Sequence, residues 1–130
     1  MKEIKNRGMS EELYFLDTYA IFEIIKGNPQ YEKYFNANII TTIFNLAELN
    51  YNLKKEMTGE MADKYTEDYF NFIIQVTLGD IKNAMDLKTK HRNLSIPDAI
   101  GYAVAKRCNA KFLTGDDDFE HFDNVEFVKK

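Results

Sequence analysis

The chain has 130 residues, of which 45% are hydrophobic and 29% charged, so it is long enough for one globular domain and too apolar for global disorder. Its 21 acidic residues outnumber its 17 basic ones and give a net charge of −4, which argues against tight, metal-independent binding to long nucleic acid. A single cysteine excludes an internal disulfide, and no apolar run is long enough to span a membrane, so cytoplasmic residence is the expectation.

Predicted strands alternate with predicted helices along the whole chain. Residues 1–12 are polar and are expected to form an N-terminal extension to a folded domain, residues 13–130. Short apolar or β-branched runs predict strands at 13–16, 38–41, 73–76, 111–114 and 125–128. Helical spacing and capping residues predict helices at about 17–25, 31–35, 42–57, 60–72, 80–91 and 95–108. This order predicts a mostly parallel sheet covered on both faces by helices.

Acidic residues stand where such a sheet gathers its functional groups, at the carboxyl ends of strands. Asp17 follows the first predicted strand and starts the first helix, so it is either an N-cap or a metal ligand. Asp98 lies in Ser95-Ile96-Pro97-Asp98, which resembles a capping box with Ser95 as the N-cap. Capping and ligation are compatible here, because an acid at a helix start already points toward a strand-end cleft.

Glu48 is harder to explain by structure alone. It lies within the helix predicted after residue 42, where Phe44, Ala47 and Tyr51 place it on or beside an apolar stripe. A carboxylate in that position is costly unless it is paired. The alternative is an edge position from which the side chain reaches water.

An acidic turn, Thr114 to Phe119, follows the strand predicted at 111–114 and contains three consecutive aspartates. Adjacent carboxylates repel one another unless they are solvated or hold a cation, so the turn is either exposed or part of a cation site. Asp17, Glu48, Asp98 and one of these aspartates would form a set of hard oxygen donors, which favours Mg²⁺ or Mn²⁺ over zinc.

Four segments of the chain, taken together, resemble the motifs of PIN-domain ribonucleases, and most closely those of the prokaryotic VapC-type toxins. The similarity spans about residues 13–128 and keeps the order and spacing of the family's motifs. The segments are Phe15-Leu16-Asp17-Thr18, Asn45-Leu46-Ala47-Glu48-Leu49, Ile96-Pro97-Asp98-Ala99 and Leu113-Thr114-Gly115-Asp116-Asp117-Asp118-Phe119.

The resemblance implies a single α/β/α sandwich with a mostly parallel sheet of about five strands. It also implies Mg²⁺- or Mn²⁺-dependent hydrolysis of RNA by the toxin of a toxin–antitoxin pair, with a small antitoxin as partner and a homodimer as assembly. The implied catalytic and metal-binding acids are Asp17, Glu48, Asp98 and Asp116, and the implied auxiliary residues are Thr18, Thr114 and Asp118. The pattern Thr114-x-Asp116 selects Asp116 as the principal acid of the turn.

A second hypothesis is a non-catalytic PIN-like module for protein interaction. Met61, Tyr65, Tyr69 and Phe72 recur at spacings of three or four in the helix predicted at 60–72. Such a stripe packs into a core or forms an interface rich in aromatic residues. Dependence on a divalent metal discriminates between the two hypotheses, because the module needs none.

Overall fold

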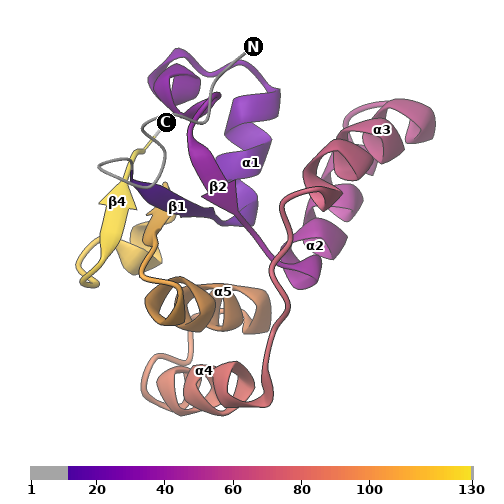
Figure 1. Cartoon of the computed structure of the whole chain (residues 1–130). Helices are drawn as coiled ribbons and strands as arrows, with labels where there is room; N and C mark the ends of the chain where they lie inside the picture. The colour runs from indigo at the N-terminus through magenta and orange to yellow at the C-terminus, as the bar shows by residue number, and fades with distance from the viewer. Residues whose placement is uncertain (1–11, 130) are drawn as a thin grey trace.

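The computed structural model describes residues 12–129, so the expected N-terminal extension lies, except for Glu12, outside the described residues. Figure 1 shows a central sheet with helices on both sides, which confirms the predicted three-layer α/β/α domain. All strand pairs in this part of the chain are parallel, and the strand order is β2-β1-β3-β4. The strands are β1 (Leu13–Leu16), β2 (Asn38–Ile40), β3 (Lys111–Thr114) and β4 (Val125–Phe127).

The two central strands divide their side chains between two hydrophobic cores. Phe15 of β1 pairs in register with Phe112 of β3, and their rings stack with centroids 5.6 Å apart on one face of the sheet. The next pair, Leu16 and Leu113, points into the other core. This alternation explains why apolar residues occupy consecutive positions in both strands, because each face of the sheet is covered.

Different helices cover the two faces. The Phe15 face packs against α5 (Ile96–Arg107), which in turn packs on α4 (Leu78–Lys90). The opposite face packs against α1 (Thr18–Ile25) and the 3₁₀ helix η1 (Pro29–Tyr34). The first strand therefore lies between the helices that carry the expected acidic residues.

The second face also receives α2 (Ile43–Lys54), and α3 (Gly59–Phe70) packs on α2 at a distance from the sheet. In Figure 1 these two helices extend to one side of the sheet as an arm. None of the helices formed by residues 12–129 is long and apolar enough to cross a membrane.

The strand expected at 73–76 is reduced to one isolated parallel bridge between Ile73 and Thr41 at the edge of the sheet. The bridge is held by hydrogen bonds from the Thr41 N–H to Phe72 O, 3.1 Å, and from the Ile74 N–H to Thr41 O, 2.8 Å. No further pairing is available because Thr42 already caps α2, which takes the chain of β2 away from the edge. An apolar run forms a strand only where a neighbouring backbone runs beside it.

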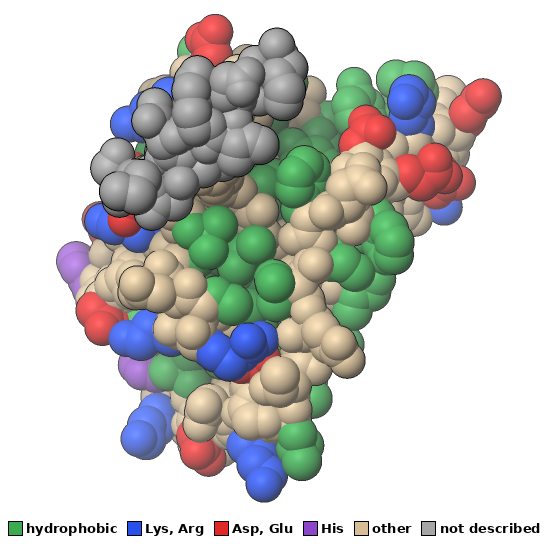
Figure 2. All heavy atoms as spheres, viewed as in Figure 1, with side chains coloured by type: hydrophobic (Ala, Val, Ile, Leu, Met, Phe, Trp, Pro, Cys, Tyr) green, Lys and Arg blue, Asp and Glu red, His purple; other side chains and the backbone are tan. Residues whose placement is uncertain are grey.

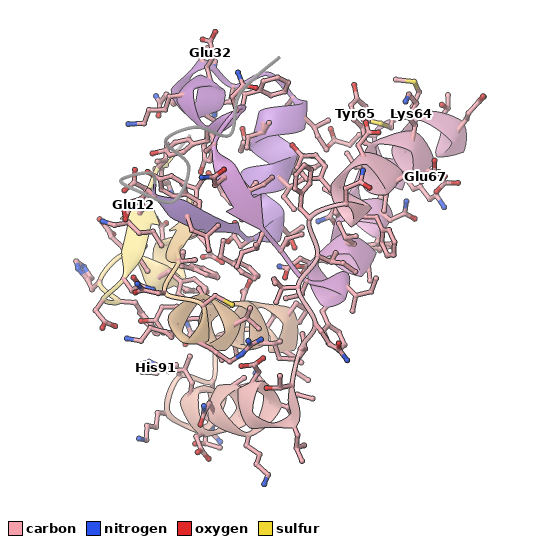
Figure 3. The ribbon with its side chains drawn as sticks, in the orientation of Figure 1. Glu12, Glu32, Lys64, Tyr65, Glu67 and His91 are labelled. Carbon is pink, nitrogen blue, oxygen red and sulfur yellow. The ribbon has the colours of Figure 1, made fainter. Side chains whose placement is uncertain are left out.

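The aromatic stripe of α3 splits between core and surface. Tyr65 and Tyr69 are half-buried against the core that contains α1 and α2, whereas Met61 and Phe72 are 47% and 42% exposed. Tyr65 lies on the side of α3 toward α1, while Lys64 and Glu67 lie on its outer side (Figure 3). Tyr65 and Tyr69 therefore attach α3 to the body of the domain, while Met61 and Phe72 remain at the surface.

Close contact between α5 and the sheet depends on Gly101. A Cβ at this position would lie 2.8 Å from Cε1 of Phe15, and Phe15 and Phe112 are fully buried and have no space to move into. We predict that Gly101→Ala lowers the free energy of unfolding by about 1–2 kcal/mol, because overpacking outweighs the gain in helix propensity. Urea denaturation measures the change.

Gly79→Ala is the matched control in α4, because a Cβ at Gly79 meets only Thr77 Oγ1, at 3.7 Å. This variant should be neutral or stabilised by up to about 1 kcal/mol, since the unfolded chain loses conformational entropy. Equal effects at the two glycines would contradict the packing of α5 described above.

Candidate active site

An acidic cleft of about 320 Å³ brings together the four acids expected from the sequence. It lies where β1 and β3 end and where α1 and α5 begin, which is the edge at which parallel sheets place their functional groups. Its lining residues are Asp17, Thr18, Tyr19, Phe22, Glu23, Glu48, Asn52, Asp98 and Asp116.

Asp17 is 1% exposed and is the N-cap of α1, where its Oδ1 accepts the N–H of Ala20 at 2.8 Å. The capping alternative is thus correct, and the same side chain also faces the cleft. Burial raises the pKa of the Asp17 carboxyl to about 8, against the opposing effect of its hydrogen bonds. The charges of Asp98 and Asp116 raise this pKa further.

Thr114 joins the ends of β1 and β3. Its hydroxyl donates a hydrogen bond to Oδ2 of Asp17 and accepts the N–H of Asp116 at 3.0 Å. The side chain is fully buried, so both bonds are shielded from water. One hydroxyl therefore fixes the positions of two acidic residues relative to each other.

Asp98 lies in the first turn of α5, whose N-cap is Ser95, as expected: the Asp98 N–H donates to Ser95 Oγ at 3.1 Å. Burial raises the pKa of the Asp98 carboxyl to about 6, and the charges of Glu48 and Asp116 raise it as well. Hydrogen bonds with Ser95 act in the opposite direction. Asp98 thus interacts electrostatically with acids from two other segments of the chain.

Glu48 is half-buried and is held by a chain of hydrogen bonds that sequence reasoning did not find. The Thr18 hydroxyl donates to Glu48 Oε1 at 2.7 Å, and Asn45 Nδ2 donates to Thr18 Oγ1 at 3.2 Å. The Thr42 hydroxyl donates to Asn45 Oδ1 at 2.7 Å, and both Thr42 and Asn45 are fully buried. The sequence signal was Asn45 itself, an amide one helical turn before the core residue Leu49.

The expected apolar stripe beside Glu48 was wrong in its residues. Phe44 and Tyr51 are 39% and 65% exposed, so they do not form the buried face of α2. That face consists of Asn45, Leu46, Leu49 and Leu53. Glu48 stands at its border, which is why its carboxylate reaches the cleft without being fully buried.

The three aspartates of the acidic turn have different surroundings. Asp116 lines the cleft and caps the 3₁₀ helix η2 (Asp117–Phe119), accepting the Asp118 N–H on Oδ1 at 3.0 Å. Asp117 is exposed and forms an ion pair with Lys129 Nζ at 2.7 Å. Asp118 is exposed and outside the lining of the cleft. Of the three, Asp116 alone faces the other acids, and the auxiliary role of Asp118 stays a prediction.

The cleft contains further residues that the sequence analysis did not select. Tyr19, Phe22 and Glu23 come from α1, and Asn52 from α2. Glu23 is 5% exposed and accepts a hydrogen bond from Asn28 Nδ2 at 3.0 Å. Its sequence signal was a lone acid inside the apolar run 21–25.

The donor set of the cleft suits a hydrated divalent cation. No three His, Cys, Asp or Glu side chains of residues 12–129 are arranged to hold an ion directly. Mg²⁺, however, commonly binds through one or two carboxylates and keeps several water ligands. The four acids share the cleft and form no ion pair with any described Lys or Arg. Burial raises the pKa values of Asp17 and Asp98, and the charges of neighbouring acids raise them further. A hard cation would neutralise this charge, so the residues fit the metal.

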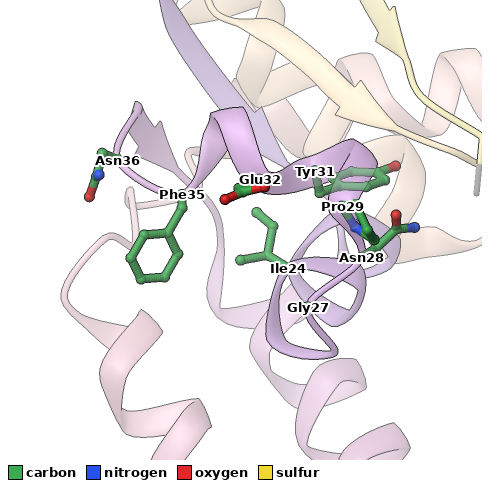
Figure 4. A pocket seen from close by; sticks show the side chains of 8 residues that line it. All are labelled: Ile24, Gly27, Asn28, Pro29, Tyr31, Glu32, Phe35 and Asn36. Atoms are coloured by element: carbon green, nitrogen blue, oxygen red, sulfur yellow. The ribbon is translucent and has the colours of Figure 1, made fainter.

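A larger cavity, of about 560 Å³, lies between the end of α1 and η1 (Figure 4). Glu32 is the acidic side chain in its lining, and Phe35, 70% exposed, stands at its rim. A single carboxylate offers little to a metal or a phosphodiester. The chemistry therefore places the candidate active site in the smaller, acidic cleft.

Comparison with known proteins identifies the relatives of this architecture. A family model described as the PIN domain matches residues 14–125. No curated protein sequence matches the chain significantly. Similar solved structures include a sarcin–ricin-loop-cleaving VapC toxin of Mycobacterium tuberculosis, 18% identical with a TM-score of 0.73, over 90% of this chain and 99% of that one.

A toxin–antitoxin complex from Klebsiella pneumoniae is similar over the same shares of the two chains, with 17% identity and a TM-score of 0.72. A VapBC complex from Rickettsia felis bound to a DNA fragment from its promoter is 20% identical, with a TM-score of 0.68 over 90% of this chain and 98% of that one. At these identities the structural likeness establishes the fold.

The raised pKa values predict how stability depends on pH without metal. The folded pKa of Asp98, about 6, lies above its ordinary value of 3.8, so between these pH values the folded state keeps a proton that the unfolded state has lost. The free energy of unfolding therefore falls as pH rises through this window, and Asp17 extends the fall to about pH 8. Urea denaturation in EDTA, at pH 4 to 8, measures the slope.

Asp98→Asn should make that slope shallower between about pH 4 and pH 6, because the titrating group is gone. Asp117→Asn is the matched control, since Asp117 lies outside the cleft, and it should keep the wild-type slope there. Identical slopes for wild type and Asp98→Asn would mean that Asp98 is not under electrostatic strain.

Proposed function

The chain belongs to the PIN-domain family, and from that premise we propose that it is a divalent-metal-dependent ribonuclease, the toxin component of a toxin–antitoxin pair. The observation that carries this proposal is the cleft itself, in which four acids from separate segments face one another without a basic partner. The solved structures with the same fold include a toxin that cleaves the sarcin–ricin loop, which supports RNA as the substrate.

Asp17, Glu48, Asp98 and Asp116 are the residues that would hold Mg²⁺ or Mn²⁺. When bound, such an ion supplies Lewis-acid chemistry, polarising a phosphate oxygen and making water a better nucleophile at neutral pH. Hydrolysis by water activated in this way needs no covalent intermediate on a side chain.

The remaining polar groups position these acids. Thr114 holds Asp17 and Asp116 at a fixed separation, and Thr18 holds Glu48 through its hydroxyl. The N-termini of α1 and α5 also meet the cleft, and their partial positive charge favours an anionic phosphate there. The protein's contribution is thus a rigid set of oxygen donors beside two helix dipoles.

A small antitoxin is the first proposed protein partner. A cavity of about 520 Å³ separates the end of α1 from α3 and is lined by apolar and aromatic side chains, among them Ile24, Phe35, Tyr65 and Phe72. Aromatic surface of this kind suits the anchor residues of a protein segment. Toxin–antitoxin complexes among the solved structures with this fold support the assignment.

A second copy of the chain is the other proposed partner. Exposed apolar residues flank the segment that joins α3 to α4 (Figure 2), and Ile43, Phe44 and Ile81 are 48%, 39% and 37% exposed there. Contiguous apolar surface of this kind marks interaction sites. It also keeps the non-catalytic interaction module as the second candidate function, which a lack of metal-dependent cleavage would favour.

Removal of one metal-binding acid tests the proposed function. We predict that Asp17→Asn and Asp98→Asn each lower the rate of RNA cleavage in Mn²⁺ by more than about 100-fold, since loss of even an outer-shell partner costs about 10- to 100-fold. Circular dichroism should show an intact fold. The rates come from a fluorogenic single-stranded RNA, with EDTA as the metal-free reference.

The acidic turn supplies a control with the same chemical change. Asp116→Asn should be as damaging as Asp98→Asn, whereas Asp117→Asn should leave most of the activity, because Asp117 pairs with Lys129 outside the cleft. Cleavage that persists in EDTA, or that Asp98→Asn leaves unchanged, would refute a metal-dependent site at these residues.

A further inference from the structure

One wall of the acidic cleft is aromatic. Tyr19 and Phe22 line the cleft from successive turns of α1, so their side chains share the cleft with the acids that would hold the metal. Both are aromatic members of a lining that is otherwise polar or acidic. Both side chains are half-buried and keep part of their surface in the cleft.

Tyr19 is the fixed end of this wall. Its ring packs over Gly115, where a Cβ would overlap both the ring and the carbonyl oxygen of Val128. The ring centroid of Tyr31 lies 6.5 Å away. Contact with Gly115 of the acidic turn and with the Tyr31 ring limits the movement of the Tyr19 ring.

Phe22 forms the other end of the aromatic wall, and a lysine ammonium lies over its ring. The ammonium of Lys26, one helical turn further on, lies 5.0 Å from the Phe22 ring centroid. Lys26 is exposed and forms no ion pair with a described acid. Its stem is flexible, so the ammonium can leave the ring, and the Phe22 ring beneath it lines the cleft.

Aromatic side chains and a cation beside a phosphodiester site match the chemistry of unpaired nucleic acid. Every base has a π-face, so aromatic rings stack on single-stranded nucleotides with little dependence on sequence, while basic groups contact the backbone. In a duplex the base faces are already stacked, and side chains reach only the groove edges and the backbone. A stacking wall therefore selects RNA in which at least one base is unpaired.

We propose that Phe22, with Tyr19 behind it, binds an unpaired nucleotide next to the scissile phosphodiester, and that Lys26 contacts a neighbouring phosphate. This inference rests on the proposed ribonuclease function and names the residues that hold the unpaired nucleotide beside the cleavage site. Phe22 is a specificity-determining residue in this account, and the acids carry the hydrolysis.

The first test compares two RNAs of the same sequence, one single-stranded and one fully paired, in Mn²⁺. Wild type should cleave the single strand and leave the duplex intact. Phe22→Leu keeps apolar packing but removes the ring, and it should raise KM for the single strand by about 5- to 100-fold with a smaller change in kcat, as expected for loss of one stacked base. Phe70→Leu is the matched control, because that ring is 55% exposed at the end of α3 and outside the cleft.

A spectroscopic arm measures stacking directly. Single-stranded RNA carrying 2-aminopurine at successive positions should show quenched fluorescence at one position on binding to wild type, and no quenching with Phe22→Leu. If wild type cleaves RNA but Phe22→Leu changes neither KM nor quenching, the inference is overturned while the ribonuclease stands. If wild type cleaves nothing, the ribonuclease proposal fails, and the quenching alone upholds or overturns nucleotide binding at Phe22.

The third arm concerns Lys26. Lys26→Gln should lower the slope of log affinity against log salt for single-stranded RNA by about 0.7, the value for one lost phosphate contact. Lys64→Gln is its control, since Lys64 lies on the outer side of α3 (Figure 3) and should leave the slope unchanged. Equal slopes for wild type and Lys26→Gln, or cleavage of the duplex as fast as of the single strand, would overturn the proposal.

Discussion

The burial and the mutual repulsion of carboxylates that share one cleft are the constraint on which the candidate site depends. A parallel sheet brings the ends of β1 and β3 to one edge, and this topology places Asp17 and Asp116 near Asp98 whatever their charge. Burial is the larger part of the cost: Asp17 is 1% exposed, and burial raises the pKa of its carboxyl to about 8, with the charges of Asp98 and Asp116 raising it further. The fold tolerates this arrangement through Thr114, which ties the two strand ends together with one hydroxyl.

The fold was predictable to the extent that local signals determine it. The strands at 13–16 and 111–114 were placed correctly because each is a short apolar run that ends at a turn residue, Asp17 or Gly115. The segment 73–76 is rich in β-branched residues and equally suited to a strand but forms only a bridge, since its pairing depends on where α2 begins. The composition of a segment shows that it can form a strand. Whether it pairs depends on which other segment of the chain lies beside it.

The candidate site shows the same division. Asp17, Asp98 and the acidic turn were predictable because strand ends and helix starts are visible in sequence, whereas the choice of Asp116 over Asp117 came from the pattern Thr114-x-Asp116 that the family resemblance implies. The aromatic wall and the Asn45–Thr18–Glu48 chain were not, because helical spacing does not tell which face of α1 or α2 meets the cleft. In α2 the spacing of Phe44 and Tyr51 predicted an apolar stripe, but both side chains are exposed.

The central claim is that the acids form one strained site which a divalent cation relieves, and thermal melts test it most directly. In EDTA, Asp98→Asn should melt above wild type, because one repelling charge is gone. Mn²⁺ should then raise the melting temperature of wild type and of the control Asp117→Asn by more than that of Asp98→Asn, since only the intact set gains metal-linked stability. Equal shifts in all three proteins would contradict the account.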